Sequence, residues 1–380
     1  MMKYSVLIVQ ILALMISQTL FAAAKPVPNP PELNASSYYL VDFDSGRVLA
    51  EKNADKRVEP ASITKLMTAY LVDKAIQAGD LLLEETVTIS EKAWRMKGSK
   101  MFVEVGKQVS VEDLMKGLII QSGNDASVAL AEHIAGTEEA FAGYMNHQAK
   151  VLGMNNTQFV NATGWPHENH YSTARDIAIL AQAMIRDFPT SYQLYKVREY
   201  TYNNIRQYNR NRLLWRDDSV DGVKTGHTEA AGYCLVSSAN RENMRLISVV
   251  LGALNDKSRN QSSQSLLNYG FRFFKTHKLY QKNQTLKRSR IWYGEQEQIN
   301  IGISQDIFIT IPRGRYKELV ANMEVDSEIT APIKQGQELG LMKIHLDDEL
   351  LIEEPLVAIQ SVSEGSLVDR ALDSIKLLFK

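Results

Sequence analysis

The chain has 380 residues, of which 44% are hydrophobic and 23% charged, which is enough apolar material for two domains with at least one large packed core. Lysine and arginine number 43 against 44 aspartates and glutamates, so the formal net charge is −1 at pH 7. Such a balanced charge gives no reason to expect nucleic acid as a partner.

The amino terminus has the pattern of an export signal. Lys3 precedes an apolar stretch over residues 6–21, and Ala22 to Ala24 lead into a proline-rich segment. This order is typical of a cleavable secretory signal, which we predict over residues 1–24. An uncleaved membrane anchor is the alternative, although the stretch contains polar residues and is short for a membrane span.

The first candidate for chemistry follows a predicted β-hairpin over residues 37–51. Pro60 is suited to a helix entrance, and the segment after it is rich in helix-compatible residues, so Ser62 falls in the first predicted turn. Residues three apart on a helix lie roughly 5 to 6 Å apart at Cβ, so the Lys65 amine can reach the Ser62 hydroxyl. Lys65 can serve as a base if burial, a second cation or the helix start lowers its pKa. A Ser-x-x-Lys pair also occurs by chance in a chain of this length, so the pair needs support from elsewhere.

A second polar group falls between two predicted helices. Residues 83–105 indicate short strands or loops, and Ser110 to Asp113 then have the spacing of a helix cap. The next helix is predicted over residues 125–135. Between the two, Ser122-Gly123-Asn124 can direct two polar side chains into one cleft, with the glycine permitting unusual backbone angles. The triplet also fits an ordinary turn.

Residues 163–171 are a predicted loop before a helix that begins within residues 172–176. The loop contains His167-Glu168-Asn169-His170, which is one residue shorter than the His-Glu-x-x-His of zinc peptidases. The neighbouring Pro166 also argues against the helical setting that this zinc motif needs. We therefore expect no metal here, and a solvated loop or a wall of a substrate cleft instead.

A third motif, Lys224-Thr225-Gly226, precedes two predicted neighbouring strands over residues 232–237 and 244–251. We expect the motif to lie on a strand at the rim of a cleft, where its ammonium, its hydroxyl and a glycine that permits close backbone approach suit a substrate that carries a carboxylate. Cys234, the only cysteine of the chain, lies in the first of these strands. We expect it to pack in the core, and the chain can form no internal disulfide.

The carboxyl-terminal part changes in composition. From about Lys275, isoleucines alternate with polar residues and predict a small all-β domain over residues 275–362, a structural or binding module. Residues 363–380 predict an amphipathic helix that we expect to lie on a membrane surface. Packing on the β-domain and self-association are the alternatives. Its charges cancel, so attachment would depend on apolar burial.

Together the three motifs resemble the set found in penicillin-binding proteins and class A β-lactamases. Over nearly its full length the chain resembles the low-molecular-mass penicillin-binding proteins of the D-alanyl-D-alanine carboxypeptidase kind (peptidase family S11). The resemblance implies an α/β (α+β) β-lactamase-like catalytic domain over residues 25–274, followed by the all-β domain and the terminal helix. It also implies no cofactor, and a location in the periplasm, peripheral on the periplasmic face of the inner membrane.

The resemblance further implies a role for each motif residue. Ser62 would attack the carbonyl of the penultimate D-alanine of a peptidoglycan stem pentapeptide, Lys65 would accept its proton, and Ser122 would pass a proton to the leaving nitrogen. Lys224 would also keep Lys65 neutral by like-charge repulsion. The implied substrate-binding residues are Asn124 for the substrate amide, Lys224, Thr225, Gly226 and Arg259 around the terminal carboxylate, and His227, whose backbone amide would complete an oxyanion hole with that of Ser62.

The chain departs from class A β-lactamases in two places. Gly123 stands where they carry an aspartate, and residues 161–176 lack their deacylation pattern. β-Lactam antibiotics are therefore expected to acylate Ser62 and leave slowly, as covalent inhibitors. A DD-endopeptidase that acts on cross-links and a non-catalytic wall-binding scaffold are the alternative functions.

Overall fold

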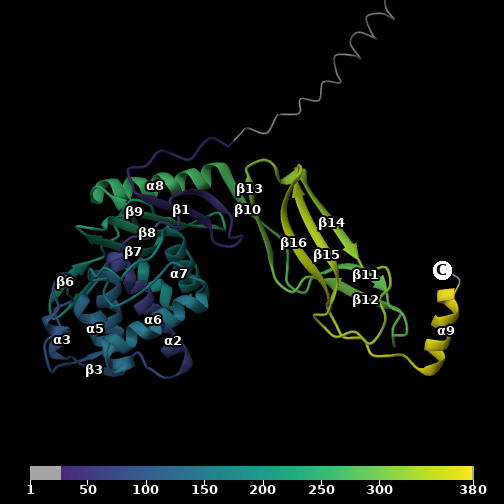
Figure 1. The fold of residues 1–380 in the computed structure, drawn as a ribbon, viewed down its shortest axis with the longest axis horizontal. Helices are drawn as coiled ribbons and strands as arrows, with labels where there is room; N and C mark the ends of the chain where they lie inside the picture. Colours follow the sequence, from purple (N-terminus) through teal and green to yellow (C-terminus); the bar gives the residue numbers. More distant parts are fainter. Residues whose placement is uncertain (1–26, 379–380) are drawn as a thin grey trace, which may run out of the picture.

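The computed structural model describes residues 27–378, which form an α/β body, a β-rich body and a terminal helix (Figure 1). This confirms the predicted fold class. The predicted signal, residues 1–24, lies outside the described residues.

The α/β body is built on a five-stranded antiparallel sheet in the order β2-β1-β9-β8-β7. Both faces of this sheet are buried, because successive side chains of a strand point to opposite faces. Val249 therefore packs in one core and its neighbour Val250 in the other. The strands, which include the predicted hairpin, are β1 (Ser37–Asp42), β2 (Val48–Lys52), β7 (Val220–Thr228), β8 (Gly232–Arg241) and β9 (Met244–Ala253).

Helices cover both faces of the sheet (Figure 1). One face is covered by α8 (Asp256–Phe273), and the other is covered by a larger helical layer. Side chains cap these helices as the sequence indicates: the Asp113 amide donates to Ser110 Oγ, and Thr173 caps the helix expected near residue 172. The helices of the layer are α2 (Lys65–Ala78), α3 (Glu91–Arg95), α4 (Val111–Lys116), α5 (Asn124–Ala135), α6 (Glu138–Leu152) and α7 (Ala174–Asp187).

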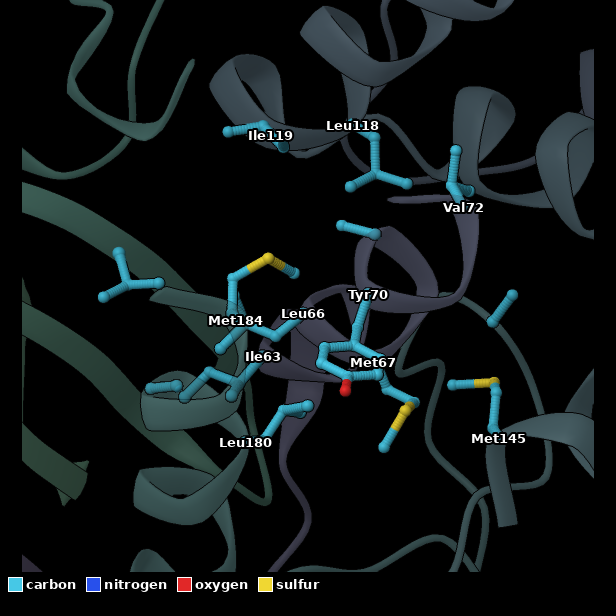
Figure 2. Close-up of a cluster of buried hydrophobic side chains, with 14 of the residues drawn as sticks. Ile63, Leu66, Met67, Tyr70, Val72, Leu118, Ile119, Met145, Leu180 and Met184 are labelled. Atoms are coloured by element: carbon cyan, nitrogen blue, oxygen red, sulfur yellow. The ribbon is translucent and has the colours of Figure 1, made fainter. Parts of the chain in front are cut away.

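Helix α2 runs through the centre of this layer. Leu66, Met67 and Val72 are fully buried, and Figure 2 shows their side chains among those of neighbouring elements, including Leu118 and Leu180. A helix that is apolar on nearly every side belongs in a core rather than on a surface. The first turns of α2, which carry Lys65, are therefore packed inside the core.

Shorter elements complete the α/β body. None of them covers residues 102–105, which form a loop. These elements are β3 (Thr86–Thr88), β4 (Gln108–Ser110), the hairpin β5 (Glu199–Tyr202) and β6 (Ile205–Tyr208), and the 3₁₀ turns η3 (Ser191–Lys196) and η4 (Arg212–Trp215).

The β-rich body contains a five-stranded sheet in the order β11-β12-β16-β15-β14 and the pair β10-β13. Its core consists mainly of the alternating isoleucines, as predicted. It meets the α/β body through Thr276, whose hydroxyl donates to Asp42 at 2.6 Å, and through the Thr310 carbonyl, 2.7 Å from Arg47. The elements are β10 (Phe274–Tyr280), β11 (Thr285–Arg290), β12 (Gln298–Gly302), β13 (Ile307–Pro312), η5 (Tyr316–Glu318), β14 (Leu319–Val325), β15 (Glu338–Leu346) and β16 (Glu349–Ala358).

Helix α9 (Leu367–Leu378) lies at the end of the β-rich body that is remote from the α/β body (Figure 1). Asp373 is buried and attaches the helix, accepting hydrogen bonds from Arg290 and from the backbone amide of Tyr293, each at 2.8 Å. The apolar side faces outward, with Leu367 77% and Leu378 82% exposed. Between residues 27 and 378, no helix has both the length and the apolar content that crossing a bilayer requires.

Candidate active site

The predicted nucleophile lies on a tight turn rather than in an α-helix. Residues Ala61–Thr64 form a 3₁₀ turn, η1, and α2 begins only at Lys65, so the predicted α-helical first turn is corrected. The expected contact forms nevertheless, because a 3₁₀ turn also aligns residues three apart. Lys65 Nζ lies 3.0 Å from Ser62 Oγ. Ser62 is partly exposed, whereas Lys65 is fully buried.

The Lys65 amine has two further acceptors. Asn124 Oδ1 and the Thr163 carbonyl each lie 2.7 Å from Nζ, so all three ammonium hydrogens have an acceptor. Burial lowers the pKa of Lys65 to about 7, against the opposing charges of Asp125 and Glu138. A lysine with this pKa is neutral in a large fraction of molecules near pH 7, so it can accept a proton.

The Ser122-Gly123-Asn124 triplet joins two helical elements, as predicted. Its backbone conformation differs from the one that we expected. Ser122, not the glycine, takes the left-handed conformation, with φ of 65°, after the π-helical stretch η2 (Gly117–Gln121). Gly123 has an ordinary φ of −59°, so the expectation that it supplies unusual backbone angles is wrong. It is needed for space, because a Cβ there would lie 2.8 Å from Asp125 Oδ1.

The Lys224-Thr225-Gly226 motif lies on β7 as predicted and faces the other two motifs. Lys224 Nζ donates to Ser122 Oγ at 2.7 Å, which connects the second and third motifs directly. A Cβ at Gly226 would lie 3.0 Å from the Pro60 carbonyl, so the glycine lets the strand approach the nucleophile turn closely. His227, the next residue, is exposed, and its ring packs on Tyr233 with 4.0 Å between centroids.

The charges of Lys65 and Lys224 do not affect each other's pKa in the way that we predicted from the sequence. We predicted that Lys224 would keep Lys65 neutral, but burial is the main cause of the lowered Lys65 pKa. The repulsion between the two lysines instead lowers the pKa of Lys224. That pKa lies well below its usual value, first because of burial and then because of the charges of Lys65, Arg210 and Arg259. Proximity to Arg210 is a feature that the sequence analysis missed.

Two polar side chains that the sequence analysis missed hold the walls of the site. The buried Asp125 carboxylate accepts hydrogen bonds from the backbone amides of Met101, Phe102 and Val103 at 2.9, 2.9 and 3.3 Å. Asn161 Oδ1 accepts from the amide of Thr163 at 3.1 Å and so shapes the turn that presents the Thr163 carbonyl to Lys65. The available signals were an aspartate at a helix start and an asparagine three residues before a glycine.

His170 is buried, so the expectation of a solvated loop fails for this residue. The Val160 amide donates to Nδ1 at 3.2 Å, which places the ring proton on Nε2, 2.8 Å from Thr64 Oγ1. Burial lowers the pKa of His170 to about 4, so the ring is neutral near pH 7. His170 thereby attaches its loop to the nucleophile turn. Within residues 27–378, no three His, Cys, Asp or Glu side chains gather closely enough to hold a metal ion.

Arg259 reaches the site from α8. Its guanidinium donates to the carbonyls of Gly226 and Cys234 at 3.3 and 3.4 Å, and to Asp256 at 2.6 Å. It therefore supports β7 beside the predicted carboxylate position. Cys234 is buried as predicted, and burial raises the pKa of its thiol to about 11.

Comparison with known proteins gives consistent matches along the chain. Residues 24–255 match the sequence profile of D-alanyl-D-alanine carboxypeptidases, and residues 274–364 match that of the C-terminal domain of penicillin-binding protein 5. The D-alanyl-D-alanine carboxypeptidase DacA of Escherichia coli K12 is 44% identical over 361 residues, covering 93% of this chain and 90% of DacA. The carboxypeptidase DacC of the same organism is 44% identical over 369 residues, covering 95% and 92%.

Solved structures agree with these matches. Penicillin-binding protein 5 from Haemophilus influenzae has a TM-score of 0.85 at 42% identity, covering 89% of this chain and all of that one. Penicillin-binding protein D2 from Listeria monocytogenes, solved in the ampicillin-bound form, has a TM-score of 0.59 at 32% identity, covering 64% of this chain and all of its own.

Proposed function

The chain belongs to the D-alanyl-D-alanine carboxypeptidase family of serine peptidases, and from this premise we propose that Ser62 is its nucleophile and Lys65 the base. The protein is a penicillin-binding serine carboxypeptidase that acts on peptidoglycan stem peptides. The observation that carries the assignment of residues is the 3.0 Å contact between Lys65 Nζ and Ser62 Oγ. This contact lies where all three motifs meet.

In the first step Ser62 Oγ attacks the carbonyl of the penultimate D-alanine while neutral Lys65 takes its proton. Asn124 and the Thr163 carbonyl fix the amine against Ser62, so the base needs no rearrangement before the attack. The backbone amides of Ser62 and His227 stabilise the oxyanion, a contribution typically of about 3 kcal/mol per donor. The close approach of β7 at Gly226 supports this placement.

In the second part of the step the leaving nitrogen needs a proton. Ser122 can supply it, since its hydroxyl lies 2.7 Å from Lys224 Nζ and belongs to the same polar network. Lys224 and Thr225 provide hydrogen-bond donors, and Arg259 provides positive charge, for the terminal carboxylate of the substrate. The terminal D-alanine then leaves, and water hydrolyses the ester on Ser62.

β-Lactam antibiotics enter the same reaction as covalent inhibitors. Their strained amide takes the place of the scissile peptide, and the bulky acyl group remains on Ser62 because it obstructs the water that hydrolysis requires. A non-catalytic scaffold would have no need to retain the Lys65 contacts and the low Lys65 pKa, so those features favour an enzyme.

We further propose that the protein is exported to the periplasm and held at the membrane surface by α9. The helix attaches to the β-rich body through Asp373 and leaves Leu367, Leu372, Ile375 and Leu378 exposed. This orientation presents apolar side chains to a bilayer rather than to the protein. The absence of a net charge on the helix means that binding depends on apolar burial.

The carboxypeptidase assignment is tested with the chain over residues 25–380 and a purified stem pentapeptide. We expect release of free D-alanine, followed by mass spectrometry, and a loss on the order of 10³-fold or more in Ser62→Ala. Insensitivity to a chelator would agree with a metal-independent reaction. No release by the unaltered protein would refute the assignment.

A further inference from the structure

The turn that presents the Thr163 carbonyl to Lys65 packs against the nucleophile turn and also borders a cavity. On one side there is no room for a Cβ at Gly164, because the Ala61 carbonyl lies against it. Another side of the turn lines a cavity of about 490 Å³ together with Glu138. Side-chain packing cannot hold a segment against open space, so polar contacts have to hold the turn there.

Three helices supply these polar contacts, and all of them act on Ala162, the residue before Thr163. Its carbonyl accepts hydrogen bonds from Thr68 Oγ1 of α2 at 2.7 Å and from Ser127 Oγ of α5 at 2.6 Å. Its amide donates to Glu138 Oε1, at the start of α6, at 3.0 Å. Both backbone polar groups of Ala162 are thus bound by side chains, and the amide is bound by a carboxylate.

The Glu138 carboxylate is itself fixed in place. Glu138 is only 7% exposed, and its Oε2 lies 3.0 Å from Lys92 Nζ of α3, which leaves Oε1 for the Ala162 amide. The position at a helix start also favours a negative charge. Burial of a charge is nevertheless costly, and a neutral amide side chain would accept the same hydrogen bond. The charge of Glu138 therefore calls for a reason beyond the hydrogen bond.

That reason is found in Lys65. Burial lowers the Lys65 pKa, and the negative charges of Asp125 and Glu138 oppose this effect. The other titratable groups near Lys65 are Lys224 on β7 and His170, which is neutral near pH 7. Asp125 binds the backbone amides of a different wall. Glu138 thus combines a contact with the turn and a negative charge that favours the protonated form of Lys65.

We propose that Glu138 is a positioning residue for the reaction: its carboxylate, fixed by Lys92, holds the Ala162–Thr163 segment so that the Thr163 carbonyl stays on the Lys65 amine. The inference rests on the proposed roles of Ser62 and Lys65. Glu138 acts through Thr163 and Lys65 rather than on the substrate.

Three variants separate the contact from the charge. Glu138→Gln keeps an acceptor for the Ala162 amide and removes the charge, whereas Glu138→Ala removes both. The matched control is Glu139→Gln on the same helix. Glu139 is exposed and lies 3.1 Å from the same Lys92 amine, so this control also removes a carboxylate partner of that lysine.

The measurement is the single-turnover rate of acylation by benzylpenicillin, across the pH range that spans the Lys65 pKa. It is expressed per molecule that finally carries the adduct, so unfolded protein does not contribute. Glu138→Gln should move the midpoint of the profile down by about half a pH unit, because loss of the negative charge lowers the Lys65 pKa, and should keep the plateau within about threefold. Glu138→Ala should lower the plateau about tenfold, because the Thr163 carbonyl loses its support. Glu139→Gln should change neither.

A residue that only stabilises the fold would change the melting temperature without moving the midpoint. An unchanged midpoint in Glu138→Gln, or a plateau in Glu138→Ala within twofold of the unaltered protein, overturns this inference. If Glu138→Ala does not fold, Lys92→Met takes its place, since it leaves Glu138 unfixed and should lower the plateau about threefold. An unaltered protein that is not acylated at all overturns the proposed function as well, which distinguishes the two failures.

Discussion

At the scale of single residues, the account depends on Lys65. Its amine is buried, contacts three oxygen acceptors and has a pKa of about 7. Burial disfavours the charged form, and this is the shift that a general base needs in order to operate near neutral pH. The spacing of Ser62 and Lys65 predicted their contact because the two residues are close in sequence.

The Lys65 pKa predicts a pH dependence of acylation. The neutral, reactive fraction of Lys65 rises as pH increases through about 7, so the acylation rate by benzylpenicillin should rise about tenfold between pH 6 and pH 8 and then level off. Stopped-flow measurement of the adduct tests this. Lys65→Arg, which retains the charge and cannot deprotonate, should fold and fail to acylate. A flat profile between pH 5.5 and 9 would contradict the role of Lys65.

Asp73 provides a second prediction, about stability. It is buried in α2, its Oδ2 has no hydrogen-bond partner among residues 27–378, and burial raises its pKa to about 7. The folded state therefore holds a proton that the unfolded state releases near pH 4, so stability falls as pH rises from about 4 to 7. The penalty above pH 7 is roughly 4 kcal/mol.

Asp73→Asn removes this charge and should raise the melting temperature at pH 8 but change it little at pH 4.5, where the aspartate is already protonated. Thermal unfolding at the two pH values measures the difference. Equal effects at both would show that Asp73 is not the protonated group.

At the scale of elements, the site is formed where η1, the start of α5 and β7 converge. The motifs themselves could be predicted because each is a short run of residues on one element. Their supports could not, since the Lys65 contact with Thr163 spans 98 residues and the Thr64 contact with His170 spans 106. Such partners are defined by the fold rather than by spacing. The lack of space for a Cβ at Gly123, beside Asp125 Oδ1, is likewise a feature that no local pattern indicates.

At this scale we predict that the hydrogen bonds of Asp125 are needed for both stability and activity. Asp125→Asn replaces an acceptor of three backbone amides with a group that accepts at only one of its two atoms, so it should destabilise the protein by about 2 to 3 kcal/mol. D-Alanine release should fall as well, because the 101–103 segment lies beside the Ser122 turn. Denaturant unfolding and activity assays measure both. Asp80→Asn, at an exposed site, is the control, and an equal effect in the two variants would contradict the account.

At the scale of the whole molecule, the catalytic body lies at one end and the terminal helix α9 at the other, with the β-rich body between them (Figure 1). The alternation of isoleucines predicted the β-rich body because period-two burial is specific to half-buried strands. The polar attachment of α9 through Asp373 was not predictable, since its partner Arg290 lies 83 residues away.

Removal of α9 tests the proposed anchoring. A chain ending before Glu364 should move from the membrane fraction to the soluble fraction, because the exposed leucines and isoleucine of α9 are lost. Activity on a soluble pentapeptide should stay within about twofold, as the catalytic body is unchanged. The replacement Leu372→Glu in the full chain, on the exposed apolar side, should weaken membrane binding in the same direction. Continued membrane binding of the shortened chain would refute the role of α9.

The most direct test of the central claim is to find the atom that penicillin acylates. The protein is incubated with benzylpenicillin, and its intact mass and peptide map are measured. We predict one adduct of the mass of intact benzylpenicillin on Ser62 of the segment that includes Lys65, and none in Ser62→Ala. An adduct on another residue, or undiminished labelling of Ser62→Ala, would contradict the claim that Ser62 is the nucleophile.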